Sequence, residues 1–151
     1  KPFTTLAVFL LIANLLVADI KDFWVLRQQR DSRYDIYQAA GTWLQQNTPE
    51  DALTAALEIG ILGYYAQRPM IDFAGLLHPA VTRQLVGAQD YEAAAIFTVE
   101  QFRPDYLVLH QGLFPNLESK LDDYACVQAQ ILDGKAYNYS RVLIIVACNP
   151  P

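Results

Sequence analysis

The sequence predicts an α/β fold, a three-layer sandwich in which helices cover a mostly parallel sheet that ends in an antiparallel hairpin. Two observations support this prediction. Segments with helical spacing of apolar residues alternate with short apolar runs bounded by Gly, Pro and Asp, as in strands joined by helices. The last two apolar runs flank Asp133-Gly134-Lys135, a turn signal that indicates an antiparallel pair. A chain of 151 residues can form one such domain.

Helices are predicted where apolar residues recur every three or four positions, as Ile36, Ala40, Trp43 and Leu44 do. Pro79 suits the first turn of a short helix. The predicted helices are 34–47, a single turn at 61–65, 79–86, 91–102 and 117–124. The predicted strands are 52–57, 69–73, 106–109, 125–132 and 140–147.

The N-terminal segment is the most apolar part of the chain. No residue from Pro2 to Ala18 is charged, and Asn14 stands among aliphatic side chains. As a helix this segment would be ~26 Å long, against a hydrocarbon core of ~30 Å. A transmembrane helix over residues 1–20 is the preferred interpretation, with a signal peptide and a buried helix as alternatives. Residues 21–33 would then be a connector and 34–151 the α/β domain.

Composition excludes several function classes. The net charge is −5 and no Lys/Arg cluster occurs, so neither nucleic acid nor a polybasic lipid-binding surface is expected. His78 and His110 have no further ligand at metal-binding spacing, so neither a metal nor another cofactor is expected. Cys126 and Cys148 fit no metal signature; buried free thiols are favoured, and a disulfide between neighbouring strands is the alternative in an oxidising compartment.

Candidate ligand-binding residues follow the first two predicted strands. Glu58 comes after the first strand and Asp72 ends the second. Ligands of open α/β sheets bind outside the carboxyl ends of strands, so both acids are expected at one rim, beside the backbone of Gly60 and Gly63. There the acids would bind sugar hydroxyls or act as an acid/base pair. In the structural alternative, Glu58 caps nearby amides and Asp72 pairs with Arg68.

The neighbouring residues allow two interpretations as well. Gly60-x-x-Gly63 lacks the further residues of a phosphate loop, so it indicates tight turning and close packing. Tyr64 and Tyr65 would stack on a sugar or lie half-buried with satisfied hydroxyls. His110 ends a strand near the same rim, where a hydrogen-bonded structural role is favoured. No serine elbow or other catalytic residue is identified.

A combined pattern of motifs resembles a known module. The motifs are Tyr37-x-x-Ala40-Gly41-x-Trp43-Leu44-x-x-Asn47-Thr48-Pro49-x-Asp51-Ala52, Glu58-Ile59-Gly60-x-x-Gly63-Tyr64-Tyr65, Ile71-Asp72-x-Ala74-Gly75-Leu76-x-x-Pro79 and Phe102-Arg103-Pro104-Asp105-Tyr106-Leu107. Together they resemble the C-terminal extracytoplasmic domain of bacterial polytopic membrane glycosyltransferases, relatives of protein mannosyltransferases and aminoarabinose transferases. The resemblance covers roughly residues 34 to 110.

The resemblance implies a periplasmic α/β domain, and the apolar N-terminal segment would tether it to the cell membrane by a single pass. It implies membrane lipid, other transmembrane helices or subunits, and a polyprenyl-phosphate-linked sugar as partners. The family's catalytic acid lies in an early extracytoplasmic loop that this sequence lacks, so no catalytic residue carries over. Lys21, Arg27, Arg30 and Arg33 argue for the opposite orientation, because basic residues favour the cytoplasmic side.

Two hypotheses about the whole protein are favoured over a third, a free-standing soluble enzyme. In the first, the chain is the sugar-facing domain of a longer transferase, with a concave rim at Glu58, Tyr64, Tyr65 and Asp72. In the second, it is a non-catalytic accessory subunit whose N-terminal helix packs against partner helices. Asn14 would then form a hydrogen bond across that helix interface.

Overall fold

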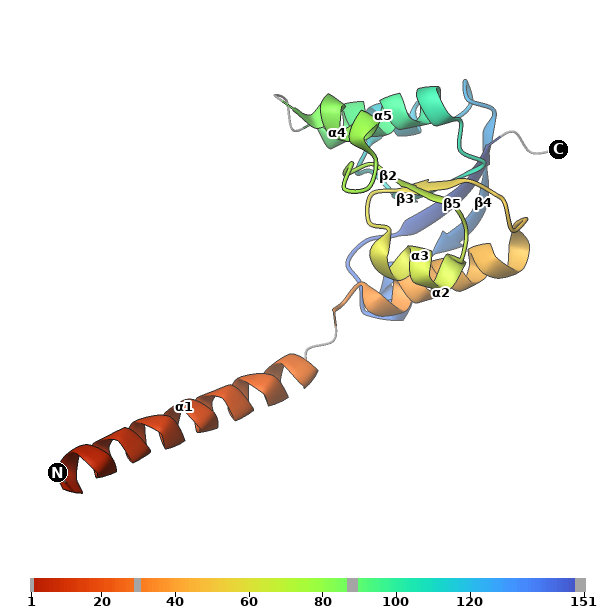
Figure 1. Ribbon diagram of the computed structural model, residues 1–151. Coiled ribbons are helices and arrows are strands. Elements are labelled where there is room, and N and C mark those ends of the chain that lie inside the picture. The colour runs from red at the N-terminus through yellow and green to blue at the C-terminus, as the bar shows by residue number, and fades with distance from the viewer. Residues whose placement is uncertain (1, 29–30, 87–89, 149–151) are drawn as a thin grey trace. The chain divides into compact units, whose positions relative to one another are not determined.

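The computed structural model describes residues 2–28, 31–86 and 90–148, and the chain divides into two compact parts, Lys1–Asp31 and Ser32–Pro151 (Figure 1). The first part contains one helix, α1 (Pro2–Gln28). The second part contains a five-stranded sheet and the remaining helices. The structure therefore confirms a mixed α/β fold.

Over residues 11–27, helix α1 has no separate polar face, because exposed apolar side chains surround its axis. Leu11, Leu16 and Leu26 are all exposed. Among the residues that the structure describes, no helix combines the length and the apolar character that crossing a membrane requires, so the transmembrane helix expected over residues 1–20 is not supported. Charged residues from Asp19 onward end the apolar run within the helix, and the side chains of residues 1–10 lie outside the described part.

The sheet has the order β2-β1-β3-β5-β4. Its strands are β1 (Thr54–Ala56), β2 (Met70–Asp72), β3 (Tyr106–His110), β4 (Cys126–Leu132) and β5 (Leu143–Cys148). The pairs β1–β2 and β1–β3 are parallel, whereas β3–β5 and β4–β5 are antiparallel. The sheet is thus evenly mixed and not mostly parallel, because β5 returns between β3 and β4 and adds a second antiparallel pair.

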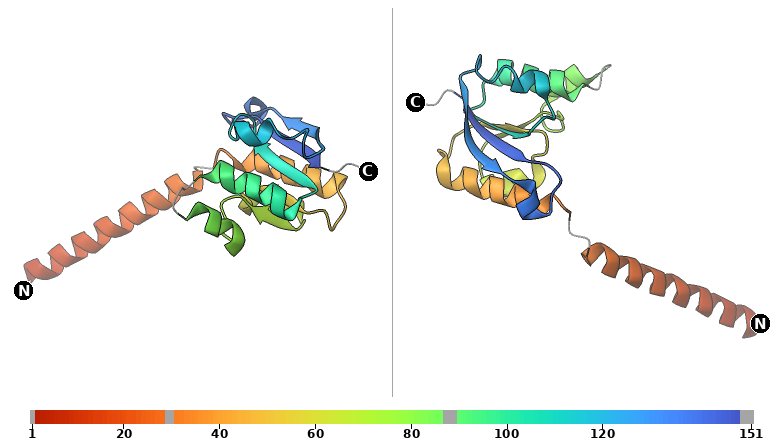
Figure 2. Two further views of the ribbon diagram at one scale, coloured as in Figure 1. Left: turned by 90° about the horizontal axis from the view of Figure 1, so that it is seen from above. Right: turned by 180° about the vertical axis from the view of Figure 1, so that it is seen from behind.

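Helices cover both faces of the sheet, as the three layers of Figures 1 and 2 show. The helices are α2 (Tyr34–Asn47), α3 (Gly60–Ala66), α4 (Pro79–Leu85), α5 (Tyr91–Phe102) and α6 (Pro115–Glu118), with a 3₁₀ turn, η1 (Gly134–Tyr137). Helix α6 is shorter than the predicted 117–124 and begins earlier, because Pro115 takes its first turn.

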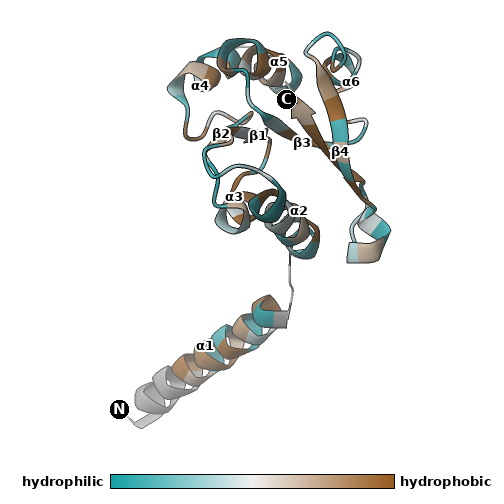
Figure 3. Ribbon diagram, turned by 90° about the vertical axis from the view of Figure 1, so that its right-hand side faces the viewer, coloured by the Kyte–Doolittle hydropathy of each residue, from teal (hydrophilic) through white to brown (hydrophobic). Residues whose placement is uncertain are grey.

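The alternation of side chains along β3 divides the hydrophobic core into two clusters. Leu107 and Leu109 belong to the cluster that also contains Val81 of α4 and Val99 of α5. Val108, one residue between them, belongs to the other cluster, with residues of α2 and α3. Hydrophobic residues accordingly follow β3 in Figure 3. The centre of the sheet, at β3, is therefore buried on both faces.

The edge strand β4 contains a bulge. Gln128 lies opposite Val146 and Gln130 lies opposite Ile145, so Ala129 is an extra residue with no partner of its own. Consequently Val127 and Ile131 project from opposite faces of the sheet, although they are four positions apart, an even number that would place them on one face of a regular strand. Both are about half exposed.

The two cysteines are joined. Cys126 and Cys148 are direct cross-strand partners of β4 and β5, and the structure bonds them as a disulfide. Both are buried, with 4% and 5% of their surface exposed. Of the two interpretations of the sequence, the disulfide is the one that the structure contains, and the favoured free thiols were wrong.

Candidate functional site

A hollow of about 570 Å³ lies at the carboxyl ends of β1 and β2. We call this hollow the rim hollow. Its lining residues are Leu57, Glu58, Ile59, Gly60, Ala74, Leu76, Leu77 and Tyr91. Glu58 and Gly60 thus lie where the sequence predicted a binding rim. Tyr91 was not predicted there, because it begins α5, a distant element that only the fold brings to this edge.

Glu58 is held by an arginine. The Arg33 guanidinium donates through one nitrogen to both oxygens of the Glu58 carboxylate, at 2.6 and 2.7 Å. Each side chain of this pair is about 40% exposed, so the carboxylate is oriented while it stays open to the hollow. The predicted capping of the next helical turn by Glu58 is absent, since α3 has no side-chain cap at its start.

Asp72 has a structural role in the loop after β2. Its side chain is fully buried, and its two oxygens accept hydrogen bonds from the amides of Leu76 (2.8 Å) and Leu77 (2.9 Å). It does not line the rim hollow and does not pair with Arg68. Arg68 instead donates to the Thr48 hydroxyl and to carbonyls around the end of α2. The acids therefore do not form an acid/base pair.

The close packing predicted for Gly60 and Gly63 occurs instead at Gly41. A Cβ atom at Gly60 would meet no atom within 4 Å, and one at Gly63 would touch only the Met70 side chain, at 3.4 Å. A Cβ atom at Gly41 would lie 2.7 Å from the Leu62 carbonyl oxygen and 2.8 Å from the Tyr65 Cβ. Gly41 therefore allows α2 and α3 to pack backbone against backbone.

Tyr64 and Tyr65 differ in their surroundings. Tyr64 is 75% exposed and contacts the Tyr65 ring edge to face, with ring centroids 5.1 Å apart. Tyr65 is half-buried, and its hydroxyl forms a hydrogen bond with the Tyr34 hydroxyl. Neither tyrosine lines the rim hollow. The structure thus favours the structural interpretation for Tyr65, whereas most of the Tyr64 side chain is exposed to solvent.

His110 lies at the centre of a buried polar cluster that the sequence did not predict in full. The hydroxyls of Tyr37 and Tyr139 lie 3.1 and 3.0 Å from its Nε2 atom. Burial lowers the pKa of His110, and the nearby Arg141 adds to this effect. Burial also raises the pKa of Tyr37, as does the negative charge of Glu58. The hydrogen bonding expected of His110 is therefore confirmed.

The arrangement determines which ligand groups the rim hollow can bind. One carboxylate with a fixed orientation faces a hollow with mostly apolar walls, and its charge is balanced by Arg33. Such a site accepts hydrogen bonds from uncharged hydroxyl groups, whereas it offers no uncompensated cation to a phosphate. Within the described ranges no group of His, Cys, Asp or Glu side chains has a metal-binding arrangement.

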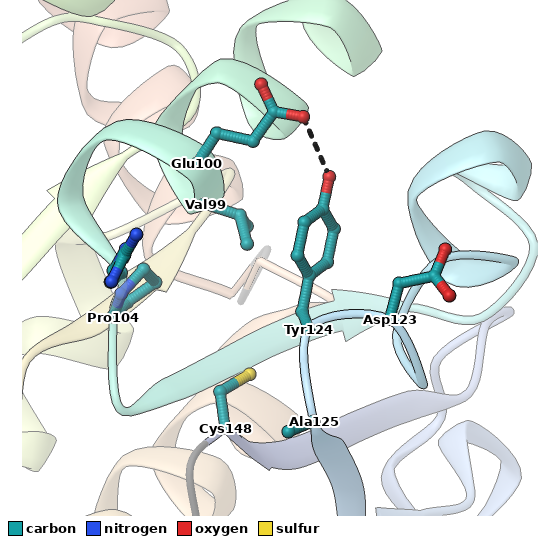
Figure 4. A pocket seen from close by; sticks show the side chains of 8 residues that line it. Val99, Glu100, Pro104, Asp123, Tyr124, Ala125 and Cys148 are labelled. Carbon is teal, nitrogen blue, oxygen red and sulfur yellow. Dashed lines mark hydrogen bonds between the residues drawn. The ribbon is translucent and has the colours of Figure 1, made fainter.

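A second hollow, of about 590 Å³, lies at the opposite edge of the sheet (Figure 4). Its wall includes Cys148 of the disulfide and Tyr124, whose hydroxyl donates to Glu100 at 3.0 Å. That hydrogen bond and partial burial raise the pKa of Tyr124, with burial the larger cause. This hollow contains none of the residues that the sequence predicted to bind a ligand.

Comparison with known proteins gives a family without an assigned activity. Residues 22–144 match the family described as a domain of unknown function, DUF8728. No curated protein and no solved structure matches the chain. Because the match covers most of the α/β part, the chain belongs to the DUF8728 family.

Proposed function

We propose that this chain is a membrane-tethered, non-catalytic α/β domain of a membrane glycosyltransferase that uses a polyprenyl-phosphate-linked sugar. In this proposal the rim hollow contacts the sugar of the lipid-linked donor. The observation that carries the proposal is the hollow at the carboxyl ends of β1 and β2, where Arg33 orients the Glu58 carboxylate toward an apolar-walled space. Sugars combine hydroxyl donors with apolar ring faces, which this combination accommodates.

Two further features support the proposal. The disulfide between Cys126 and Cys148 agrees with an extracytoplasmic location, because disulfides persist in oxidising compartments. The exposed apolar surface of α1 agrees with a membrane anchor, because such surface is unfavourable in water. The domain itself contributes binding and not bond cleavage, since neither Glu58 nor Asp72 is paired with a second free acid or base.

The test measures binding of a short-chain polyprenyl-phosphate hexose, with the same polyprenyl phosphate lacking the sugar as reference. Replacing Glu58→Gln should weaken binding of the sugar compound about tenfold, because a hydrogen bond to a charged group contributes about 1.5–3 kcal/mol. Glu100→Gln, in the opposite hollow, is the matched control and should leave affinity unchanged. Equal affinity for both compounds, or an unaffected Glu58→Gln variant, would contradict the proposal.

A second candidate function is that of an accessory subunit of a membrane complex. The observation that favours it is that residues 11–27 of α1 expose apolar side chains on every side, together with the polar Asn14, as expected of a helix that packs against other helices. The mass of the native polypeptide, extracted in mild detergent, separates the two candidates. A chain several times longer indicates a transferase tail, whereas a chain of this length in fixed ratio with other membrane proteins indicates a subunit.

A further inference from the structure

The loop after β2 exposes large apolar side chains at the rim hollow. Leu76 is 82% exposed, Leu77 is 68% exposed and Tyr91 is 48% exposed. We call these three residues the apolar rim surface. The buried Asp72 carboxylate accepts hydrogen bonds from the amides of both leucines, so the loop is held in this form. Two adjacent leucines that are exposed to solvent, in a loop whose backbone is fixed by a buried carboxylate, indicate a contact surface.

The polypeptide enters the α/β part at this same edge. Arg33 stands at the start of α2 and binds Glu58, which lines the rim hollow beside Leu76 and Leu77. Helix α1 ends at Gln28. Three residues separate Gln28 from Ser32, and the four Cα–Cα steps between them span at most about 14 Å at ~3.5 Å per step. The segment that follows α1 in the sequence therefore leads directly into the edge of the α/β part that carries the rim hollow.

The charge distribution at the rim favours contact with a surface that carries no net charge. Arg33 is matched by Glu58, and the residues that line the hollow include no Lys or Arg. The chain as a whole carries −5. Attraction to anionic lipid headgroups therefore cannot drive a contact here, whereas insertion of Leu and Tyr side chains into the boundary between headgroups and acyl chains can.

We propose that the apolar rim surface rests on a lipid bilayer, with Leu76, Leu77 and Tyr91 inserted at the headgroup level. This inference rests on the membrane tethering of the proposed function and adds an orientation to it. The carboxyl edge of the sheet faces the bilayer, and the amino edge, with the disulfide, faces away. The rim hollow then opens at the height of a lipid-linked headgroup.

The test places single tryptophans in the full chain, reconstituted in phosphatidylcholine vesicles with or without brominated acyl chains, which quench indole emission on contact. Trp24 reports on α1 in the Trp43→Phe background. Leu77→Trp, combined with Trp24→Phe and Trp43→Phe, reports on the apolar rim surface. Val127→Trp in the same background is the matched control, because Val127 is 53% exposed and lies at the opposite end of the sheet.

The expected result is quenching and a blue shift of the Leu77→Trp indole similar to those of Trp24, unchanged at high salt, with no quenching of the Val127→Trp indole. Quenching of Trp24 alone would overturn the orientation and leave the tether intact, and this is the result expected if a partner protein covers the rim. Equal quenching at positions 77 and 127 would also overturn the orientation. Absence of quenching at Trp24 would overturn the tether and the inference with it.

Discussion

At the scale of single residues, the two acids predicted at the rim have opposite roles, although each lies near the carboxyl end of one of two neighbouring strands. Asp72 is fully buried and satisfied by two backbone amides, so it shapes the loop. Glu58 is partly exposed and held by Arg33, so it can meet a ligand. The position of each acid after a strand predicted its edge of the sheet, but its burial depends on the loop that follows.

The partners of these residues could not be read from the sequence. Arg33 lies 25 positions before Glu58, and Tyr139 lies 29 positions after His110. Nothing in the local pattern links such residues, because only the stacking of α2 and the return of β5 bring them together. Tyr37 lies three positions before Ala40 in the helical pattern, and this spacing was the available signal that Tyr37 faces the sheet.

The lowered pKa of His110 makes stability depend on pH. The folded state disfavours the imidazolium, so the unfolded state binds more protons between the two pKa values. The free energy of unfolding should therefore keep its maximum above pH ~6.5, the pKa of histidine in an unfolded chain, and fall as the pH drops below that value. Urea unfolding at a series of pH values from neutral to about 5 measures this slope.

The matched variants for this prediction are His110→Gln and His78→Gln. The first removes the titrating group, so the slope in this pH range should flatten. The second replaces the histidine outside the Tyr37–His110–Tyr139 cluster and should keep the slope. An unchanged slope in His110→Gln would show that the loss of stability arises from other groups.

At the scale of elements, the contact between α2 and α3 depends on Gly41. In Gly41→Ala the new methyl group meets the backbone of α3 at 2.7–3.0 Å, so the helices must separate. We expect a loss of about 1–3 kcal/mol in the free energy of unfolding, despite the better helix propensity of alanine. Urea unfolding measures it. The matched control is Gly60→Ala, where no atom lies within 4 Å and stability should hold or rise; equal losses would refute the packing argument.

The disulfide joins the last two strands across 22 positions of sequence. In the chain-entropy account, closing a loop of this length stabilises the fold by about 3 kcal/mol. Replacing both cysteines by serine should therefore lower the urea midpoint, and a reductant should lower the midpoint of the native chain similarly. The double variant should not respond to the reductant. A native midpoint that is insensitive to reduction would contradict the expected contribution.

The elements themselves were largely predictable. Helices 34–47 and 91–102 match α2 and α5 residue for residue, because apolar spacing and flanking breakers defined both ends. The order of the sheet was harder to predict. The turn signal predicted that β4 and β5 pair. The second partner of β5, strand β3, was not predicted, although the uniformly apolar sequence of β5 is typical of a strand that is buried on both faces at the centre of a sheet.

At the scale of the whole molecule, both core clusters lie within Ser32–Pro151. A fragment that begins at Ser32 keeps Arg33 and all of these core residues. Its free energy of unfolding should therefore match that of the full chain within about 0.5 kcal/mol, as for surface changes. Chemical denaturation of both proteins, the longer one in detergent, tests this. A fragment that unfolds at much lower denaturant would show that residues 1–31 stabilise the α/β part.

The bulge at Ala129 has a consequence for behaviour at high concentration. Strand β4 is an outer strand without charge or proline, a composition that invites pairing with a strand of another molecule and growth into fibres. Because the extra residue shifts Val127 and Ile131 to opposite faces, this edge cannot offer a regular ladder to a second copy. A single irregular residue thus protects the chain against self-assembly where its composition does not.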